Sequence, residues 1–140
     1  MLSLNRAPTS SASLSKDRLE IGKQTFEKIT GDVGKKFLEN LKEVAPDFAD
    51  YLVEFPYGTI YSRPGFDIKT RELIILSSLA TQGNAAIELK AHIKIALNAG
   101  IEREQIIELF MQISVYAGFP AAVNAILAAK DVFKELDRKK

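Results

Sequence analysis

Apolar side chains recur at every third or fourth residue from about position 14 to position 136, and this spacing is the main signal in the sequence. Ile21, Phe26 and Ile29 illustrate it in the first half. Such spacing gathers apolar side chains on one face of a helix, and no alternation of the kind that marks a half-buried strand competes with it. We therefore predict an all-α fold with about six to seven helices.

Glycine and proline residues divide the first half of this pattern into helices. Gly31 and Gly34 interrupt it, so a first helix should stop near Thr30 and a second should begin near Gly34. The second helix should end at Pro46, which suits the first turn of a third helix because no N–H donor is needed there. Residues 56–65 contain two prolines and two glycines, and we expect them to form a loop.

Start and stop signals delimit four more helices in the second half. Short polar side chains cap the free N–H groups of a first turn, and glycine favours the end of a helix. The expected starts are at Asp67, Asn84, Glu102 and Pro120, and the expected stops are at Gly100 and Gly118. The segment 71–80 is apolar almost all round, so this helix should be buried on several sides. Lys90 and Lys94 should face outward from the helix that follows it.

The second half carries more apolar helix surface than a chain of 140 residues can easily cover by itself. Burial stabilises such surface by roughly 25 cal/mol per Å², so an interface of a few hundred square ångströms would contribute several kcal/mol. We therefore expect a homo-oligomer.

The domain organisation is expected to be simple. Residues 1–13 are rich in serine and lack acidic side chains, which is typical of a flexible tail, and residues 14–140 should form a single helical domain. The apolar run of a secretory signal is interrupted in this tail by Asn5, Arg6 and Pro8, so we expect a cytoplasmic protein.

Composition and charge exclude several classes of function. Nineteen basic and eighteen acidic residues give a net charge of +1, which disfavours binding to nucleic acid or to an anionic membrane. The sequence has no cysteine, so disulfides, thiolate nucleophiles and cysteine-based zinc sites are excluded. Its single histidine also excludes most histidine-based metal sites. We expect no cofactor and no metal.

His92 and Glu72 are the main candidates for acid and base chemistry. Histidine is the one type of side chain whose ordinary pKa lies near neutrality, which makes His92 the natural proton donor. A hydrogen-bonded core histidine is the alternative. Glu72 lies in an otherwise apolar helix, where a carboxylate needs a partner. That partner could be a catalytic group, Arg71, or an arginine of another subunit.

Four further residues could bind a substrate. Arg63 and Arg71 could each bind a carboxylate through two parallel hydrogen bonds, although Arg71 could equally form a structural salt bridge with Glu72. Tyr61 and Tyr116 could donate hydrogen bonds to an oxyanion or could instead cap backbone carbonyls.

Glu88 precedes His92 by four residues and therefore shares its helix face. Together with Glu72 the two side chains would supply three ligands for a metal ion. One histidine per chain makes a poor transition-metal site unless subunits pool their ligands, so this is the minor alternative.

Several segments occur in an order that resembles the carboxymuconolactone decarboxylase family, whose relatives include the alkylhydroperoxidase D proteins. These segments are YG at 57–58, YSRPGFD at 61–67, TRELI at 70–74, LKAH at 89–92, ALNAG at 96–100, Glu108, and YAGFPAAVNA at 116–125. The resemblance covers a core of about residues 57–136 and leaves the first 50 residues outside it.

The resemblance implies an alkylhydroperoxidase D-like helical bundle that assembles into trimers or hexamers. The founding activity of the family is the decarboxylation of 4-carboxymuconolactone without an organic or metal cofactor. The substrate accepts the electron pair itself, so the protein need only bind a carboxylate, stabilise the oxyanion and supply one proton. In the peroxidase relatives an acid at the position of Glu72 forms a proton relay with the histidine.

Two departures from the family pattern bear on the activity. The Cys-x-x-Cys pair of the peroxidase relatives is replaced by AAIE at 85–88, which removes the disulfide route of peroxide reduction, and the sequence has no tryptophan. Our leading hypothesis is a decarboxylase-like enzyme for a small unsaturated lactone or keto acid, with His92 as general acid. The alternatives are a non-catalytic oligomer that binds a small acid or acts as a scaffold and, as a lesser one, a residual peroxidase.

Overall fold

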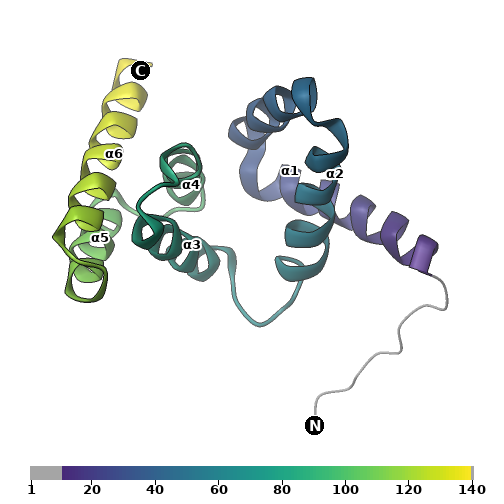
Figure 1. Ribbon diagram of the computed structural model, residues 1–140, viewed down its shortest axis with the longest axis horizontal. Helices are drawn as coiled ribbons and strands as arrows, with labels where there is room; N and C mark the ends of the chain where they lie inside the picture. Colours follow the sequence, from purple (N-terminus) through teal and green to yellow (C-terminus); the bar gives the residue numbers. More distant parts are fainter. Residues whose placement is uncertain (1–10, 140) are drawn as a thin grey trace, which may run out of the picture. The chain divides into compact units, whose positions relative to one another are not determined.

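The computed structural model describes residues 11–139, and every regular element in this range is a helix (Figure 1). This confirms the predicted all-α class. In chain order the elements are α1 (Ser11–Val44), α2 (Pro46–Leu52), η1 (Val53–Ile60), α3 (Ile68–Gln82), α4 (Ala86–Asn98), α5 (Arg103–Ala117) and α6 (Phe119–Arg138). Most of the predicted tail lies outside the described residues, and its last three positions, 11–13, belong to α1. Two compact units result, one ending at Pro64 and one beginning at Gly65.

In the N-terminal unit, α1 is bent at one glycine. Gly31 adopts φ 52° and ψ −138°, a backbone conformation that residues with a side chain rarely tolerate. The bend confirms the predicted break between Thr30 and Gly34. Pro46 then opens α2, as its lack of an N–H donor predicts.

The segment after α2 is helical, so the predicted loop over residues 56–65 is wrong for its first half. Val53–Ile60 forms a π-helix in which the N–H of Tyr61 donates to the carbonyl of Pro56 at 2.8 Å. The wider turn closes with hydrogen bonds from residue i+5 to residue i and takes in Pro56. The irregular stretch is therefore confined to residues 61–67.

Two glycines allow η1 to pack closely against α1. A Cβ atom added at Gly58 would lie 2.1 Å from the carbonyl oxygen of Arg18, and one added at Gly22 would lie 2.4 Å from the carbonyl oxygen of Val53. Backbone atoms cannot move aside as a flexible side chain can, so these positions admit only glycine without a shift of a helix.

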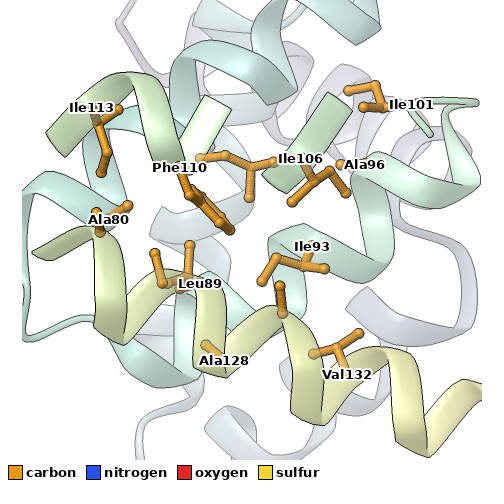
Figure 2. Packing of buried hydrophobic residues seen from close by; sticks show 14 residues of the cluster. Ala80, Leu89, Ile93, Ala96, Ile101, Ile106, Phe110, Ile113, Ala128 and Val132 are labelled. Atoms are coloured by element: carbon orange, nitrogen blue, oxygen red, sulfur yellow. The ribbon is translucent and has the colours of Figure 1, made fainter. Parts of the chain in front are cut away.

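The C-terminal unit is a bundle of α3, α4, α5 and α6 around one apolar core (Figure 2). Phe110 of α5 is fully buried and lies among Leu89 and Ile93 of α4 and Ile106 of its own helix. Helix α6 contributes mainly alanines to this core, which lets its backbone approach the other helices closely. The core residues are Leu76, Ala80, Leu89, Ile93, Ala96, Ile101, Ile106, Phe110, Ile113, Ala122, Ala125, Ala128, Ala129 and Val132.

The boundaries of these helices test the predicted caps. The side chain of Asp67 accepts a hydrogen bond from the N–H of Thr70 at 2.8 Å, and Glu102 forms a capping box with Gln105, so both caps are confirmed. The cap predicted at Asn84 is wrong, because α4 begins at Ala86 and its N-cap is Ala85. The stops near Gly100 and Gly118 and the start of α6 near Pro120 are confirmed.

Two ion pairs one helical turn apart connect α4 to α6. Lys90 binds Asp131 at 2.9 Å, and Lys94 binds Glu135 at 2.8 Å. Hydrogen bonds from Lys94 and Lys139 lower the pKa of Glu135 to about 2. Lys90 keeps 43 % and Lys94 24 % of its side-chain surface exposed, so both lie at the surface of α4 as predicted and bridge there to the neighbouring helix.

Some apolar side chains of the C-terminal unit remain at its surface. Ile74 of α3, the helix predicted to be buried on several sides, is 50 % exposed in this single chain. A larger group gathers at the end of α5 and the beginning of α6, and its exposed members are Met111, Val115, Tyr116, Phe119, Val123 and Leu127. Within residues 11–139 no helix has the length and apolar character needed to cross a membrane.

Replacing Gly58 with alanine should weaken the N-terminal unit, because the new methyl group meets the backbone of α1. Overpacking of this kind typically costs about 1–3 kcal/mol. Gly65→Ala is the matched control, since nothing lies within 4 Å of a Cβ atom at Gly65. Urea unfolding followed by circular dichroism measures both, and equal stability of the two variants would show that the close approach is unimportant.

Candidate active site

Glu72 occupies a core position of α3. It precedes Leu76 and Ala80 by four and eight residues, so the three side chains lie on one face of the helix, and all three are buried. The Glu72 side chain has no exposed surface. A carboxylate in this position loses its hydration and must be compensated by a hydrogen bond or an opposite charge.

The compensating group is His92 of α4. Its Nδ1 atom lies 2.9 Å from Oε2 of Glu72, across twenty residues of sequence. His92 stands beside Leu89, Ile93 and Ala96, which face the core, and its own side chain retains 12 % exposure. The histidine therefore joins a buried carboxylate on one side and remains reachable from outside on the other. Of the partners considered for Glu72, this contact identifies His92.

The contact determines how the imidazole ring can act. When Glu72 is ionised its carboxylate only accepts hydrogen bonds, so that Nδ1 is then the donor in this contact. In the neutral ring Nε2 then holds a lone pair, and in the imidazolium form it becomes a proton donor. The contact holds the ring in one orientation, as the buried acid does in other carboxylate–histidine pairs. Nε2 is thus the atom available for proton transfer.

The second oxygen of Glu72 is unusual for a buried carboxylate. Oε1 is buried and has no hydrogen-bond partner among the described residues. An acceptor left unsatisfied in the interior costs about 1–3 kcal/mol. Such unsatisfied groups are uncommon in folded proteins; the other two among the described residues are Nε of Arg18 and Oγ1 of Thr59 in the N-terminal unit.

Glu88 approaches the other side of the ring. Its Oε2 atom lies 4.0 Å from Nε2 of His92, one helical turn earlier on α4, and its side chain is 43 % exposed. The sequence predicted only a shared helix face and a metal alternative for this residue. Among the residues that the structure describes, no three His, Asp or Glu side chains form a group that could hold a metal ion.

Two other predicted residues lie in the same unit. Arg71 is adjacent to Glu72 on α3, and its guanidinium carbon lies 6.0 Å from the centre of the Phe66 ring. Tyr116 is at the end of α5 and is 94 % exposed. The hydrogen bonds and ion pairs of Glu72 and His92 are made with each other and with Glu88, and neither Arg71 nor Tyr116 is among these partners.

The remaining two candidates belong to the N-terminal unit. Arg63 is exposed and follows η1, and its backbone N–H donates to the carbonyl of Ile60 at 3.2 Å. The ring of Tyr61 stacks on that of Tyr57, with 4.5 Å between their centres. The roles predicted for Arg63 and Tyr61 in binding a substrate stay predictions.

The same unit contains a hollow of about 450 Å³ beside the bend of α1. Phe26, Leu38 and Val53 provide its apolar surface, and charged residues such as Lys35 and Glu39 line the remainder. Its lining includes none of the residues predicted as catalytic.

The family model described as "Carboxymuconolactone decarboxylase family" matches residues 46–131, a range that includes Glu72, Glu88 and His92. The chain belongs to the carboxymuconolactone decarboxylase family. It is 36 % identical over 118 residues to a 4-carboxymuconolactone decarboxylase of Acinetobacter baylyi, an alignment covering 81 % of this chain and 87 % of the relative. It is 30 % identical over 114 residues to the nitrosuccinic acid decarboxylase npaB of Metarhizium robertsii, covering 78 % and 79 % respectively.

Removing the imidazole should destabilise the protein, because His92→Ala leaves the carboxylate of Glu72 buried without any partner. The expected loss in the free energy of unfolding is about 3–5 kcal/mol. His92→Gln should lose only about 1 kcal/mol, since its amide N–H can still donate to Glu72. Urea unfolding at neutral pH compares the two.

The double variant Glu72→Gln/His92→Ala serves as the control for this experiment. It removes the buried charge together with its partner and should therefore be more stable than His92→Ala alone. Equal stability of His92→Ala and His92→Gln would mean that Glu72 does not depend on the ring.

Proposed function

We propose that this protein is a cofactor-independent decarboxylase that acts on a small unsaturated lactone or keto acid, with His92 as the general acid. The observation that carries the proposal is the 2.9 Å contact between Nδ1 of His92 and the fully buried Glu72. It leaves Nε2 as the one atom of the ring able to deliver a proton, on a side chain that is partly exposed.

The chemistry requires little more than that proton. When the bond to the leaving carboxylate breaks, carbon dioxide departs and the electron pair stays on the substrate, where a conjugated carbonyl holds it as an enolate. Protonation at carbon by Nε2 of His92 then completes the reaction. Glu72 orients the ring through its contact with Nδ1.

The names of the relatives support this class of substrate. The two acids concerned, 4-carboxymuconolactone and nitrosuccinic acid, differ in skeleton. Each nevertheless carries a group, a lactone carbonyl or a nitro group, that can hold the electron pair left by carbon dioxide. The shared feature is an acid that serves as its own electron acceptor, and we extend that feature, rather than either particular acid, to this protein.

The remaining candidates would bind the substrate. Arg71 or Arg63 would hold a second carboxylate through two parallel hydrogen bonds, and Tyr61 or Tyr116 would donate to the developing oxyanion. These four assignments rest on side-chain chemistry and on the family resemblance.

We also propose that the protein is a homo-oligomer, a trimer or a hexamer. The observation in favour is the group of exposed apolar side chains at the end of α5 and the beginning of α6, which includes Val115 at 70 % and Phe119 at 75 % exposure. Contiguous apolar surface of this kind marks an interaction site. A non-catalytic oligomer that binds a small acid would share this surface, and activity distinguishes it from the decarboxylase.

Purified protein should release carbon dioxide from 4-carboxymuconolactone or from a related unsaturated or nitro acid. In His92→Gln the turnover number should fall by about 10²–10⁴, because the amide preserves the contact with Glu72 but cannot deliver a proton. Carbon dioxide release and NMR spectra of the product measure this. Lys90→Gln, on the same helix, should retain activity, and full turnover by His92→Gln would remove the histidine from the mechanism.

Light scattering should give a mass that is three or six times the 15.5 kDa of one chain. Val115→Lys should shift this mass toward the monomer, because it introduces a charge into the exposed apolar group. Gln82→Lys, at the exposed end of α3, is the control and should leave the mass unchanged. A monomeric wild-type protein would contradict the proposed assembly.

A further inference from the structure

The two carboxylates beside His92 form a row that runs from the core to the surface. Glu72 faces Nδ1 and has no exposed side-chain surface, the ring of His92 is 12 % exposed, and Glu88 faces Nε2 with 43 % of its side chain exposed. The exposed fraction thus increases from Glu72 to His92 to Glu88, the order in which the three side chains contact one another. A path for protons from solvent to a partly buried ring requires such an arrangement.

Glu88 lies in the first turn of α4, where a negative charge suits the helix dipole. In the described part of the chain, its contact with His92 is the one hydrogen bond or ion pair that its side chain makes. The two lysines that follow it on α4 bind other carboxylates, Lys90 that of Asp131 and Lys94 that of Glu135 on α6. The described partner of the Glu88 carboxylate is therefore His92.

The groups around the ring also define its electrostatic environment. Of the helices packed against α4, α3 contributes Glu72 to the ring itself. Helix α6 contributes Asp131 and Glu135, whose charges are balanced by the two lysines. Among the described residues, Glu88 is consequently the charged group that contacts Nε2 and is also exposed to solvent.

A proton donor must regain its proton after each reaction. Once Nε2 has given its proton to the substrate carbon, His92 is neutral, with its remaining proton held at Nδ1 by Glu72. A bound substrate over Nε2 also restricts the access of water to a ring that is only 12 % exposed. The half-exposed carboxylate next to Nε2 is in a position to supply the missing proton.

We propose that Glu88 transfers a proton from solvent to Nε2 of His92 and thereby restores the imidazolium form after each turnover. This inference rests on the proposed decarboxylase function. The balance is one proton consumed for each carbon dioxide released: water or a buffer acid protonates the Glu88 carboxylate, Glu88 protonates Nε2, and Nε2 protonates the substrate carbon. Glu88 acts through His92 and does not itself touch the substrate.

The first test needs no substrate, because His92 is the single histidine of the chain and its ring signals in an NMR spectrum are unambiguous. A pH titration of wild type and Glu88→Gln follows the pH at which the ring gains its proton. The amide of Gln carries no charge, so the interaction of the Glu88 carboxylate with the ring is lost in this variant. The ring signals of Glu88→Gln should therefore change at a different pH from those of wild type.

Glu104→Gln is the matched control for the titration. Glu104 is likewise an acidic residue in the first turn of a helix, α5, and makes no contact with His92. Its replacement should leave the ring signals in place. Identical titrations of wild type and Glu88→Gln would overturn the proposal, whatever activity the protein has.

The second test follows turnover on whichever acid the wild type decarboxylates. Glu88→Gln should lower kcat by about tenfold or more with little change in KM, and small buffer acids such as acetate should restore it as their concentration rises. A merely structural role for Glu88 would show no rescue by buffer. A kcat equal to that of Glu104→Gln, or a loss that buffer does not relieve, would overturn the proposal.

A wild type without decarboxylase activity would refute the proposed function and, with it, the recharging step. The titration would then show separately whether Glu88 and His92 form an electrostatic pair. The two failures are therefore distinguishable.

Discussion

The arrangement of the C-terminal unit depends on a carboxylate that has been withdrawn completely from water. Glu72 takes a place on α3 where Leu76 and Ala80 continue the same buried face, and it is compensated by a single contact, from Nδ1 of His92. Because an uncompensated charge in the interior is costly, this contact constrains how α3 and α4 pack. The same contact sets the tautomer of the ring. The same contact thus joins α3 to α4 and fixes the orientation of the His92 ring.

A decarboxylase of this design leaves most of the chemistry to its substrate. In the reaction that we propose, the acid accepts its own electron pair, and the protein contributes a proton from Nε2 of His92. The exposed fraction of the side chain increases from Glu72 through His92 to Glu88. This suits proton transfer, because Glu72 is shielded from water and Glu88 is accessible to it. Loss of the thiol pair at 85–88 is consistent with chemistry that needs no electron transfer.

The sequence predicted helix ends and breaks correctly where these depend on residues within a single turn. The break at Gly31, the cap at Asp67 and the capping box at Glu102 depend on residues at most three or four positions apart, and all three are found. The π-helix around Pro56 was missed, because proline and glycine normally indicate a loop. There the packing of η1 against α1 prevails over local preference. Asn84 was misjudged as a cap because it precedes the true N-cap by one residue.

For the candidate site, the residue types alone made His92 and Glu72 the leading predictions, because a lone histidine and an acid in an apolar helix are unusual, and the structure places the two in contact. Whether Glu72 would pair with Arg71 or with His92 could not be read from spacing, since the partners stand one and twenty residues away. The crossing of α3 and α4 selected the distant one. The contact between Glu88 and Nε2 likewise depends on which ring nitrogen is hydrogen-bonded to Glu72. The sequence by itself shows which residues can donate or accept a proton. Which of them are paired depends on how α3 and α4 pack in three dimensions.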